Sequence, residues 1–570
     1  MAQSPSRDSQ MDGTWVTLAH PGSHRQAESL PDRVRRVEAD LNDINTFYSI
    51  SISPARHERL QRFYADEARS LLRLDFDALG QQGKVDFILL RKYLQRNTLQ
   101  LRAEQDGFVH LKPLLPFGDI IITLCEKRER VEPMDAERTA QQLDDINTMV
   151  GRVQRDVEQD KIKMGKTNAF KASNIIDELR GHLAEFFAFY ASYDPSFDYW
   201  ATVPYRTADG ALGRLVPLIQ TRLAGVRPGG AGDIIGEPIG REALLRELEA
   251  EVVAYSPEEL VRIARDQFSW SEGQMRRASR ELGYGDDWKR AMDQDVKTSS
   301  VPPGEQPGLV LELAREGARF VGEHDLVTVP EVAETYRATM MSAQQQQTAP
   351  FFLGGPSILI AYPTAGMAHQ LKTMVMRGNN RYFARATAFH ELIPGHRLQL
   401  FMLERHRNYR RLFTTPFFVE GWATYWELLF WQRGDFFVSP RDRIGHLFWR
   451  MHRCARILLT VGFHLGQTTP QECIDFLVES VNHERHTAEA EVRRWLSGQY
   501  GPLYQMAYMV GALQLLALRS EAVDSGRWTE KQFNDQVLTL GAIPNELVRA
   551  LVLDKELEPD YKASWKFYKL

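Results

Sequence analysis

The spacing of apolar residues constrains this fold most, because they recur every three or four positions along most of the chain. RLQRFYADEARSLLRLDF (59–76) and KVDFILLRKYLQRNTLQL (84–101) show the spacing clearly. A helix that turns ~100° per residue gathers such positions on one face. The clearest strand candidate is FFLGGPSILIAYP (351–363), which is β-branched, aromatic and bounded by Gly and Pro. We therefore predict a mainly α-helical protein with a strand at 351–363.

Breaks in the periodicity predict how the chain is organised. Residues 1–30 are polar and rich in Ser, Gln and Asp, which is typical of a flexible tail. We expect a helical N-terminal region over 31–345, with a seam at the Gly/Pro-rich stretch 225–240. The low-complexity segment 342–350 then leads into a C-terminal region, 346–570.

Composition narrows the classes of partner. The 570 residues are 43% hydrophobic and 25% charged, with a net charge of −5 and a pI near 6.3. Such a chain has no basic field for a phosphate backbone, so we expect no nucleic-acid partner. Its apolar runs fall well short of the ~20 residues of a membrane span, and its N-terminus lacks an apolar signal region. Three widely spaced cysteines, Cys125, Cys454 and Cys473, suggest reduced thiols and a cytoplasmic protein.

The segment FHELIPGHRLQL (389–400) has the residue types of a zinc-hydrolase motif at an unusual spacing. His390 and His396 lie six apart, about 120° apart on a regular helix, whereas ligands on one face lie four apart. The Pro-Gly pair between them can distort the helix and bring the imidazoles together, leaving Glu391 as the proton-accepting base. A helix that ends at this Pro-Gly stop, with two surface histidines, explains the same residues equally well.

Two carboxylates in FFVEGWATYWELLFW (417–431) favour the metal interpretation. Glu420 and Glu427 lie seven apart and therefore about 20° apart on one face of an aromatic, apolar helix. Carboxylates in such surroundings need partners. A metal would partner Glu420 as a third ligand, and Glu427 could sit behind it and hold a histidine N–H or an arginine. The alternative is a plain core helix in which Glu427 forms a salt bridge.

The segments RGNNRYFARATAFHELIPGH, FFVEGWATYWE, DRIGHLFWRMHRCARILLTVGFHLGQTTPQECIDFLVE and AEVRRWLSGQYGPLYQMAYMVGALQLLAL together resemble the family known as domain of unknown function 885. The likeness covers most of residues 35–555. That family is grouped with the zincin metallopeptidases, distantly related to carboxypeptidase Taq and thimet-type oligopeptidases. The resemblance implies a large helical zincin-like fold with one small β-sheet near the active-site cleft, whose edge strand lies along the substrate. The strand candidate at 351–363 fits that position.

The resemblance also implies roles for individual residues. His390, His396 and Glu420 match the metal ligands, and Glu391 matches the general base. The cofactor it implies is a single Zn²⁺ ion, with another divalent transition metal as the alternative.

Further residues are candidates for substrate contact. Arg453 and His464 lie eleven apart on one helical face, where they could bind a substrate carboxylate and stabilise the oxyanion, although an ion pair between Arg453 and an acid is an equal alternative. Tyr504 and Tyr508, at i and i+4, resemble the tyrosine donors of relatives but are also typical packing residues. Arg494 ends a charged run that either faces the cleft or forms a solvated helix face.

These observations predict a zinc-dependent hydrolase that cleaves amide bonds of short peptides with metal-activated water. The partner would be a short peptide or an amide-containing small molecule. One alternative uses the same metal site on a non-peptide amide, or for acyl-transfer or lyase chemistry. The other is an inactive helical interaction protein. Departures from the family pattern at Arg397, Thr460 and 502–505 leave substrate preference open, and the sequence sets no oligomeric state.

Overall fold

In the computed structural model, the described residues are 28–226, 234–347, 349, 351–353, 357–496, 498 and 500–570. The expected tail therefore lies outside the described residues up to position 27, and so does the part of the expected seam at 227–233. Helices form most of the described chain, with a single small sheet, so the prediction of a mainly α-helical protein is confirmed.

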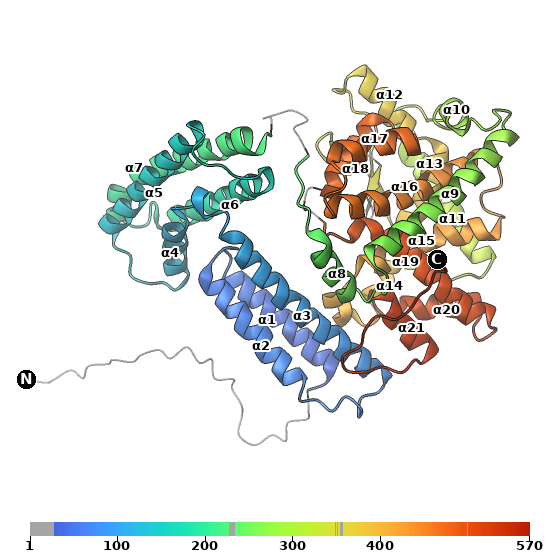
Figure 1. Ribbon diagram of the computed structural model, residues 1–570, viewed down its shortest axis with the longest axis horizontal. Coiled ribbons are helices and arrows are strands. Elements are labelled where there is room, and N and C mark those ends of the chain that lie inside the picture. The colour runs from blue at the N-terminus through green and yellow to red at the C-terminus, as the bar shows by residue number, and fades with distance from the viewer. Residues whose placement is uncertain are drawn as a thin grey trace, which may run out of the picture.

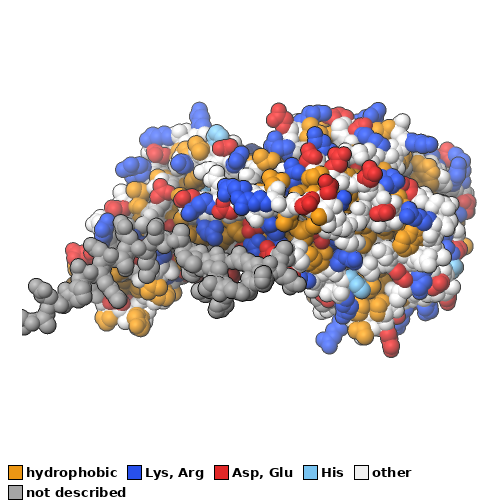
Figure 2. Space-filling model, turned by 90° about the horizontal axis from the view of Figure 1, so that it is seen from below, with side chains coloured by type: hydrophobic (Ala, Val, Ile, Leu, Met, Phe, Trp, Pro, Cys, Tyr) orange, Lys and Arg blue, Asp and Glu red, His pale blue; other side chains and the backbone are white. Residues whose placement is uncertain are grey.

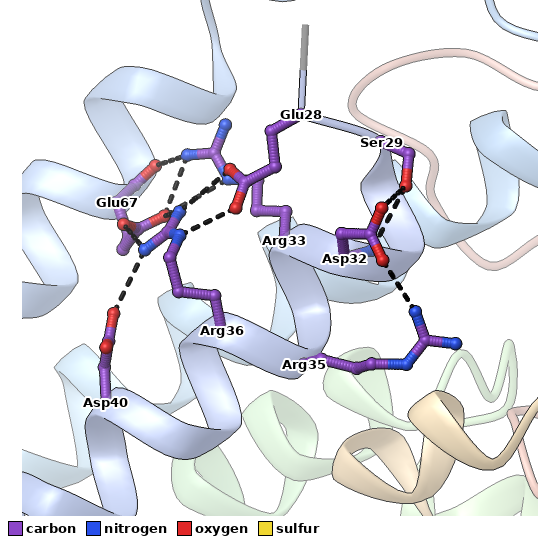
Figure 3. A network of polar contacts seen from close by, with 8 residues as sticks. All are labelled: Glu28, Ser29, Asp32, Arg33, Arg35, Arg36, Asp40 and Glu67. Atoms are coloured by element: carbon purple, nitrogen blue, oxygen red, sulfur yellow. Dashed lines mark hydrogen bonds and ion pairs between the residues drawn. The ribbon is translucent and has the colours of Figure 1, made fainter. Parts of the chain in front are cut away.

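The first three helices form a bundle that runs between the two ends of the molecule (Figure 1). Ser29 caps the first by accepting the backbone N–H of Asp32, and Ser53 caps the second in the same way. Glu67 of the second helix accepts hydrogen bonds from Arg33 and Arg36 of the first, which holds the pair together (Figure 3). These helices are α1 (Leu30–Phe47), α2 (Pro54–Leu71) and α3 (Gln81–Phe108).

Four further helices form a lobe at one end of the molecule (Figure 1). They enclose a separate apolar core, built from side chains between Ile50 and Ala224. They are α4 (Gly118–Glu129), α5 (Ala136–Glu158), α6 (Lys166–Tyr190) and α7 (Pro195–Ile219).

The remaining elements form the larger body at the other end (Figure 1). Its helices are α8 (Gly240–Ala250), α9 (Pro257–Glu281), α10 (Trp288–Ala291), α11 (Gln306–Glu323), α12 (His369–Gly378), α13 (Arg381–Glu391), α14 (His396–Leu403), α15 (Pro416–Arg433), α16 (Pro440–His464), α17 (Pro470–Val481), α18 (Arg485–Leu496), α19 (Tyr504–Arg519), α20 (Glu530–Leu538) and α21 (Asn545–Leu553).

Two apolar cores meet in this body at α13, because Phe389 packs into one core and Phe383 into the other. The first core also contains Leu30 of α1 and Trp565 near the C-terminus. The cores therefore do not separate at residue 345, and the expected division of the chain there remains a prediction.

The small sheet has the strand order β1-β3-β2, with β1 (Arg337–Met340) parallel and β2 (Phe352–Leu353) antiparallel to the central β3 (Ser357–Ile360). The single strand expected at 351–363 is therefore wrong in detail, because the segment forms two strands. β2 forms one edge of the sheet and β1 the other, so the central β3 has a partner strand on each side. β1 pairs with β3 along Ser357–Ile360, whereas β2 pairs only with Leu359 and Ile360.

Among the described residues, no helix is both long enough and apolar enough to cross a membrane. Basic and acidic side chains are interspersed over the face shown in Figure 2.

Candidate metal centre

The motif at 389–400 forms two helices instead of one distorted helix. α13 ends at Glu391 and α14 begins at His396, so His390 lies at the end of one helix and His396 at the start of the next. Gly395 makes this sharp turn possible, since a Cβ at that position would lie 1.8 Å from the carbonyl oxygen of His390. The two imidazole rings consequently meet edge to face with their centroids 4.8 Å apart.

Glu420 of α15 approaches both imidazoles. Its Oε2 lies 3.1 Å from Nε2 of His396 and 3.7 Å from Nε2 of His390. One ligand atom from each of these three residues lies within 4.8 Å of the other two, and all three residues are buried. Trp422 of the same helix fixes the approach, because its Nε1 donates a hydrogen bond of 2.9 Å to the carbonyl oxygen of Pro394 in the turn.

Opposite charges hold these three side chains together. Burial by itself lowers the pKa of His396, but the Glu420 carboxylate outweighs that effect and raises the pKa to about 9. Burial also favours a neutral Glu420, yet its contacts with His396 and His390 hold the pKa of this carboxyl well below its usual range. The imidazoles and the carboxylate therefore attract one another, which offsets the cost of burying their charge.

Glu427 lies behind His390, on α15 two helical turns after Glu420. Its Oε1 accepts a hydrogen bond of 2.6 Å from Nδ1 of His390 and one of 3.1 Å from Nη2 of Arg453. Burial opposes its ionisation, but Arg453 and His390 together lower the pKa of Glu427 to about 2. An ionised acceptor at Nδ1 fixes the tautomer of His390 and leaves Nε2 free to accept a cation.

Helices α15 and α19 touch backbone to backbone, which brings tyrosines to the same site. A Cβ on Gly511 would lie 2.0 Å from the carbonyl oxygen of Phe417, and one on Gly421 would lie 2.8 Å from the Gly511 backbone. Only glycine permits so close an approach. As a result, Tyr504 donates a short hydrogen bond to Oε1 of Glu420, and the ring of Tyr508 stacks at 6.2 Å on that of His390.

These groups surround a cavity of about 260 Å³. Glu391 lies on its wall beside both histidines. The sequence-predicted residues in its lining are His390, Glu391, His396, Glu420, Arg453, Arg494, Tyr504 and Tyr508. Phe351, the residue before β2, also lines it, so the segment that leads into the edge strand reaches the cavity.

The structure distinguishes the alternatives for Arg453 and places His464 away from the cavity wall. Of the alternatives for Arg453, the structure shows the ion pair with Glu427. His464 is absent from the lining of the cavity; it ends α16 and lies near the carbonyl groups of Glu237 and Pro502, where burial lowers its pKa. A shared helical face does not imply a shared site, because eleven residues of α-helix span about 16 Å.

Residues that the sequence analysis missed complete the far wall of the cavity. Arg456 of α16 and Glu491 of α18 line it and pair at 2.7 Å. His452 and His483 are buried behind Glu491. The signal in the sequence was the charged run at 482–494. Its Glu491 and His483 are buried and are not part of a solvated helix face.

Comparison with known proteins gives a family and a fold. Residues 49–552 match the family described as "Bacterial protein of unknown function (DUF885)". The chain resembles the solved structure of a candidate lipoprotein of unknown function from Shewanella oneidensis, with 16% identity, a TM-score of 0.69 and coverage of 92% of this chain and 100% of that one. It also resembles a candidate lipoprotein from Colwellia psychrerythraea, with 15% identity, a TM-score of 0.58 and coverage of 92% and 98%. At these identities the likeness concerns the fold alone. No curated protein matches the chain.

Proposed function

The chain belongs to the DUF885 family, and we propose that it is a zincin-like, zinc-dependent hydrolase that cleaves amide bonds of short peptides. The observation that carries the proposal is the convergence of His390, His396 and Glu420, whose ligand atoms lie within 4.8 Å of one another inside a cavity. Two imidazoles and one carboxylate are a common ligand set of catalytic zinc.

The donor atoms fit a zinc ion. Zinc–nitrogen and zinc–oxygen bonds of about 2.1 Å in a tetrahedron place neighbouring donors about 3.4 Å apart. The distances of 3.1 Å and 3.7 Å from Glu420 Oε2 to the two imidazoles lie on either side of that value. The hydrogen bond from Nδ1 of His390 to Glu427 is the supporting contact that ligating histidines usually make.

When bound, zinc would lower the pKa of a water molecule to about 7 and polarise a carbonyl group. Glu391, beside the ligands on the cavity wall, would take a proton from the attacking water and pass it to the leaving amine. Tyr508, also on the wall, would donate a hydrogen bond from its hydroxyl group to the oxyanion. Burial raises the pKa of Tyr508, so this hydroxyl keeps its proton at neutral pH.

The size of the cavity supports a small substrate. Its volume of about 260 Å³ is just below the range of about 300–1,000 Å³ that is usual for small-molecule sites. A short peptide or an amide-containing small molecule suits that volume better than an extended protein segment.

The compartment also stays a proposal. All three cysteines are unpaired and buried, which agrees with the cytoplasm that the sequence analysis expects. The word lipoprotein in the descriptions of the two solved structures concerns those proteins. Cell fractionation, together with mass determination of the mature N-terminus, tests the cytoplasmic assignment.

Elemental analysis of the purified protein tests the proposal most directly. We expect about one equivalent of zinc in the wild type and loss of most of it in His390→Ala and Glu420→Ala. Glu479→Ala is the matched control, because Glu479 is exposed and does not line the cavity. Retention of zinc in both ligand variants would remove the basis of the mechanism.

Hydrolysis assays with dipeptides and tripeptides test the reaction itself. We expect Glu391→Gln to keep its zinc and to lose at least about 100-fold in turnover, as general bases usually contribute this much. Intact zinc without turnover of any peptide would favour the non-peptide chemistry. Protein that purifies without metal, and is indifferent to Glu391→Gln, would favour the inactive interaction protein.

A further inference from the structure

The cavity has a second polar cluster, which contains two guanidinium groups, whereas the candidate metal ligands are two imidazoles and a carboxylate. Arg456 of α16 is only 3% exposed and lies on the cavity wall. Its Nη2 donates a hydrogen bond of 2.7 Å to Oε2 of Glu491, which also lines the cavity. Arg494, one turn after Glu491 on α18, lines the same wall. Two guanidinium groups therefore face a space that also contains the metal ligands.

A chain of buried hydrogen bonds holds Glu491 in position. Its Oε2 accepts from Nε2 of His452 at 3.2 Å and from Nε1 of Trp495 at 3.1 Å. His483 donates in turn from Nε2 to Nδ1 of His452 at 2.9 Å. Burial lowers the pKa of His452 to about 3 and that of His483 well below its usual value, so both rings are neutral at neutral pH. These donors fix the carboxylate of Glu491, which in turn holds Arg456 in place at the cavity wall.

Arg456 retains hydrogen-bonding capacity that no described residue uses. Its Nε and Nη1 atoms are buried and have no hydrogen-bond partner among the residues that the structure describes. They lie against the ring of Tyr508, whose centroid is 4.2 Å from Cζ. Buried N–H groups of a charged side chain are rarely left without an acceptor, and the side chain that carries these two lines the cavity in which a substrate would bind.

The distance to the metal ligands suits a particular substrate. The centroid of the Tyr508 ring lies 4.2 Å from Cζ of Arg456 and 6.2 Å from the centroid of the His390 ring, so Cζ of Arg456 is at most about 10.4 Å from that imidazole. In a peptide, the terminal carboxylate follows the scissile amide by a single residue, a step of about 3.8 Å between α-carbons. With a metal–ligand bond of about 2.1 Å at one end and a guanidinium–carboxylate hydrogen bond of about 2.8 Å at the other, one residue covers a distance of that order.

We propose that Arg456, with Arg494 beside it, binds a free carboxylate that adjoins the scissile amide. The substrate class is then a short peptide cut at its carboxyl end, or an acyl amino acid. Planar guanidinium groups match carboxylates in geometry and charge. A purely structural ion pair with Glu491 would not require Arg456 to line the cavity or to keep two N–H groups without acceptors. The cleavage rests on the proposed function, whereas binding of the carboxylate does not.

Calorimetric binding of two probes tests the carboxylate site without requiring turnover. The probes are N-acetyl-alanyl-alanine and its C-terminal amide, which differ only in the negative charge. The protein is the Glu391→Gln variant, measured as purified and again after removal of metal with a chelator. We expect the acid to bind at least about tenfold more tightly than the amide in both states, as suits a hydrogen-bonded charge.

Variants of Arg456 test whether this side chain causes the tighter binding of the acid than of the amide. Removing Arg456 alone leaves Glu491 as a buried, unpaired charge, so the test variant is Arg456→Met combined with Glu491→Gln. We expect its preference for the acid to fall to within about threefold. Arg450→Met is the matched control, because Arg450 is a buried arginine of the same helix that does not line the cavity. It should retain the full preference.

Each outcome decides the proposal. Equal affinity for acid and amide, no measurable binding of the acid at millimolar concentration, or a preference that survives the double variant would overturn it. A preference that disappears with the metal would assign the carboxylate to the ion and also overturn it. If the preference depends on Arg456 but the wild type hydrolyses no peptide, the carboxylate site stands and the peptidase proposal fails.

Discussion

The contact between α15 and α19 offers the sharpest test of how the fold positions the site. In Gly511→Ala, the new Cβ would lie 2.0 Å from the carbonyl oxygen of Phe417, about 1.4 Å short of ordinary contact at 3.4 Å. Both groups belong to helix backbones, so no side-chain rotation relieves the overlap. We expect a loss of at least about 3 kcal/mol in the free energy of unfolding, at the upper end of overpacking effects.

Two matched glycines calibrate that value. In Gly421→Ala the Cβ would lie 2.8 Å from the backbone of Gly511, a smaller overlap, and we expect a loss of about 1–3 kcal/mol. Gly273 of α9 has open space around its Cβ position, so Gly273→Ala should stabilise the protein by about 0.5–1 kcal/mol. The same Gly→Ala change should therefore lower the free energy of unfolding at Gly511 and Gly421 and raise it at Gly273.

Urea unfolding followed by tryptophan fluorescence measures the order of the three variants. A zinc competition assay measures the site, since a retreat of α15 by about 1 Å displaces Glu420 from the histidines. We expect Gly511→Ala to bind zinc at least about tenfold more weakly and Gly273→Ala to match the wild type. Equal stability of Gly511→Ala and wild type would refute the backbone contact and the argument that it positions Glu420.

Three further outcomes are expected. Glu427→Gln leaves Arg453 buried without a counter-charge and should lower the free energy of unfolding by about 3–5 kcal/mol, with partial recovery when Arg453→Met is added; urea titrations of both variants check this. His452 has its pKa lowered from 6.5 to about 3, so the folded state loses stability as the pH falls below 6.5, by up to about 1.4 kcal/mol per unit. His452→Gln should reduce that slope by the share of one histidine in unfolding curves at pH 7, 6 and 5, because the buried His446 and His483, whose pKa values are also lowered, keep their contributions; an unchanged slope would contradict it. Tyr504→Phe loses the hydrogen bond to Glu420 and should weaken zinc binding about tenfold in a chelator competition, with unchanged stability.

Local periodicity was enough to predict the fold class. The apolar spacing at 59–76 and 84–101 corresponds to α2 and α3, because a helix with one buried face needs that spacing wherever it packs. The segment 351–363 carried a strand signal, but its division into β2 and β3 depends on pairing with β1, which comes from elsewhere in the chain. Pairing between distant segments leaves no mark in local composition.

The three candidate ligands could be named from the sequence, since their residue types and their apolar surroundings are local properties. How His390 and His396 meet could not, because either a distorted helix or a helix stop fits the letters. The backbone around Gly395 decides for two helices. The position of His464 away from the cavity wall has the same origin, since helical angle is local but distance to the cavity depends on how α16 packs.

By itself, then, the sequence determined which segments are helical and which side chains could hold a cation, because both follow from the residues within one or two turns. Only the tertiary structure decided that Arg456 and Glu491 face the same cavity as those side chains. They reach it from α16 and α18 through the packing of whole helices, and that packing reflects the shape of every contact between them.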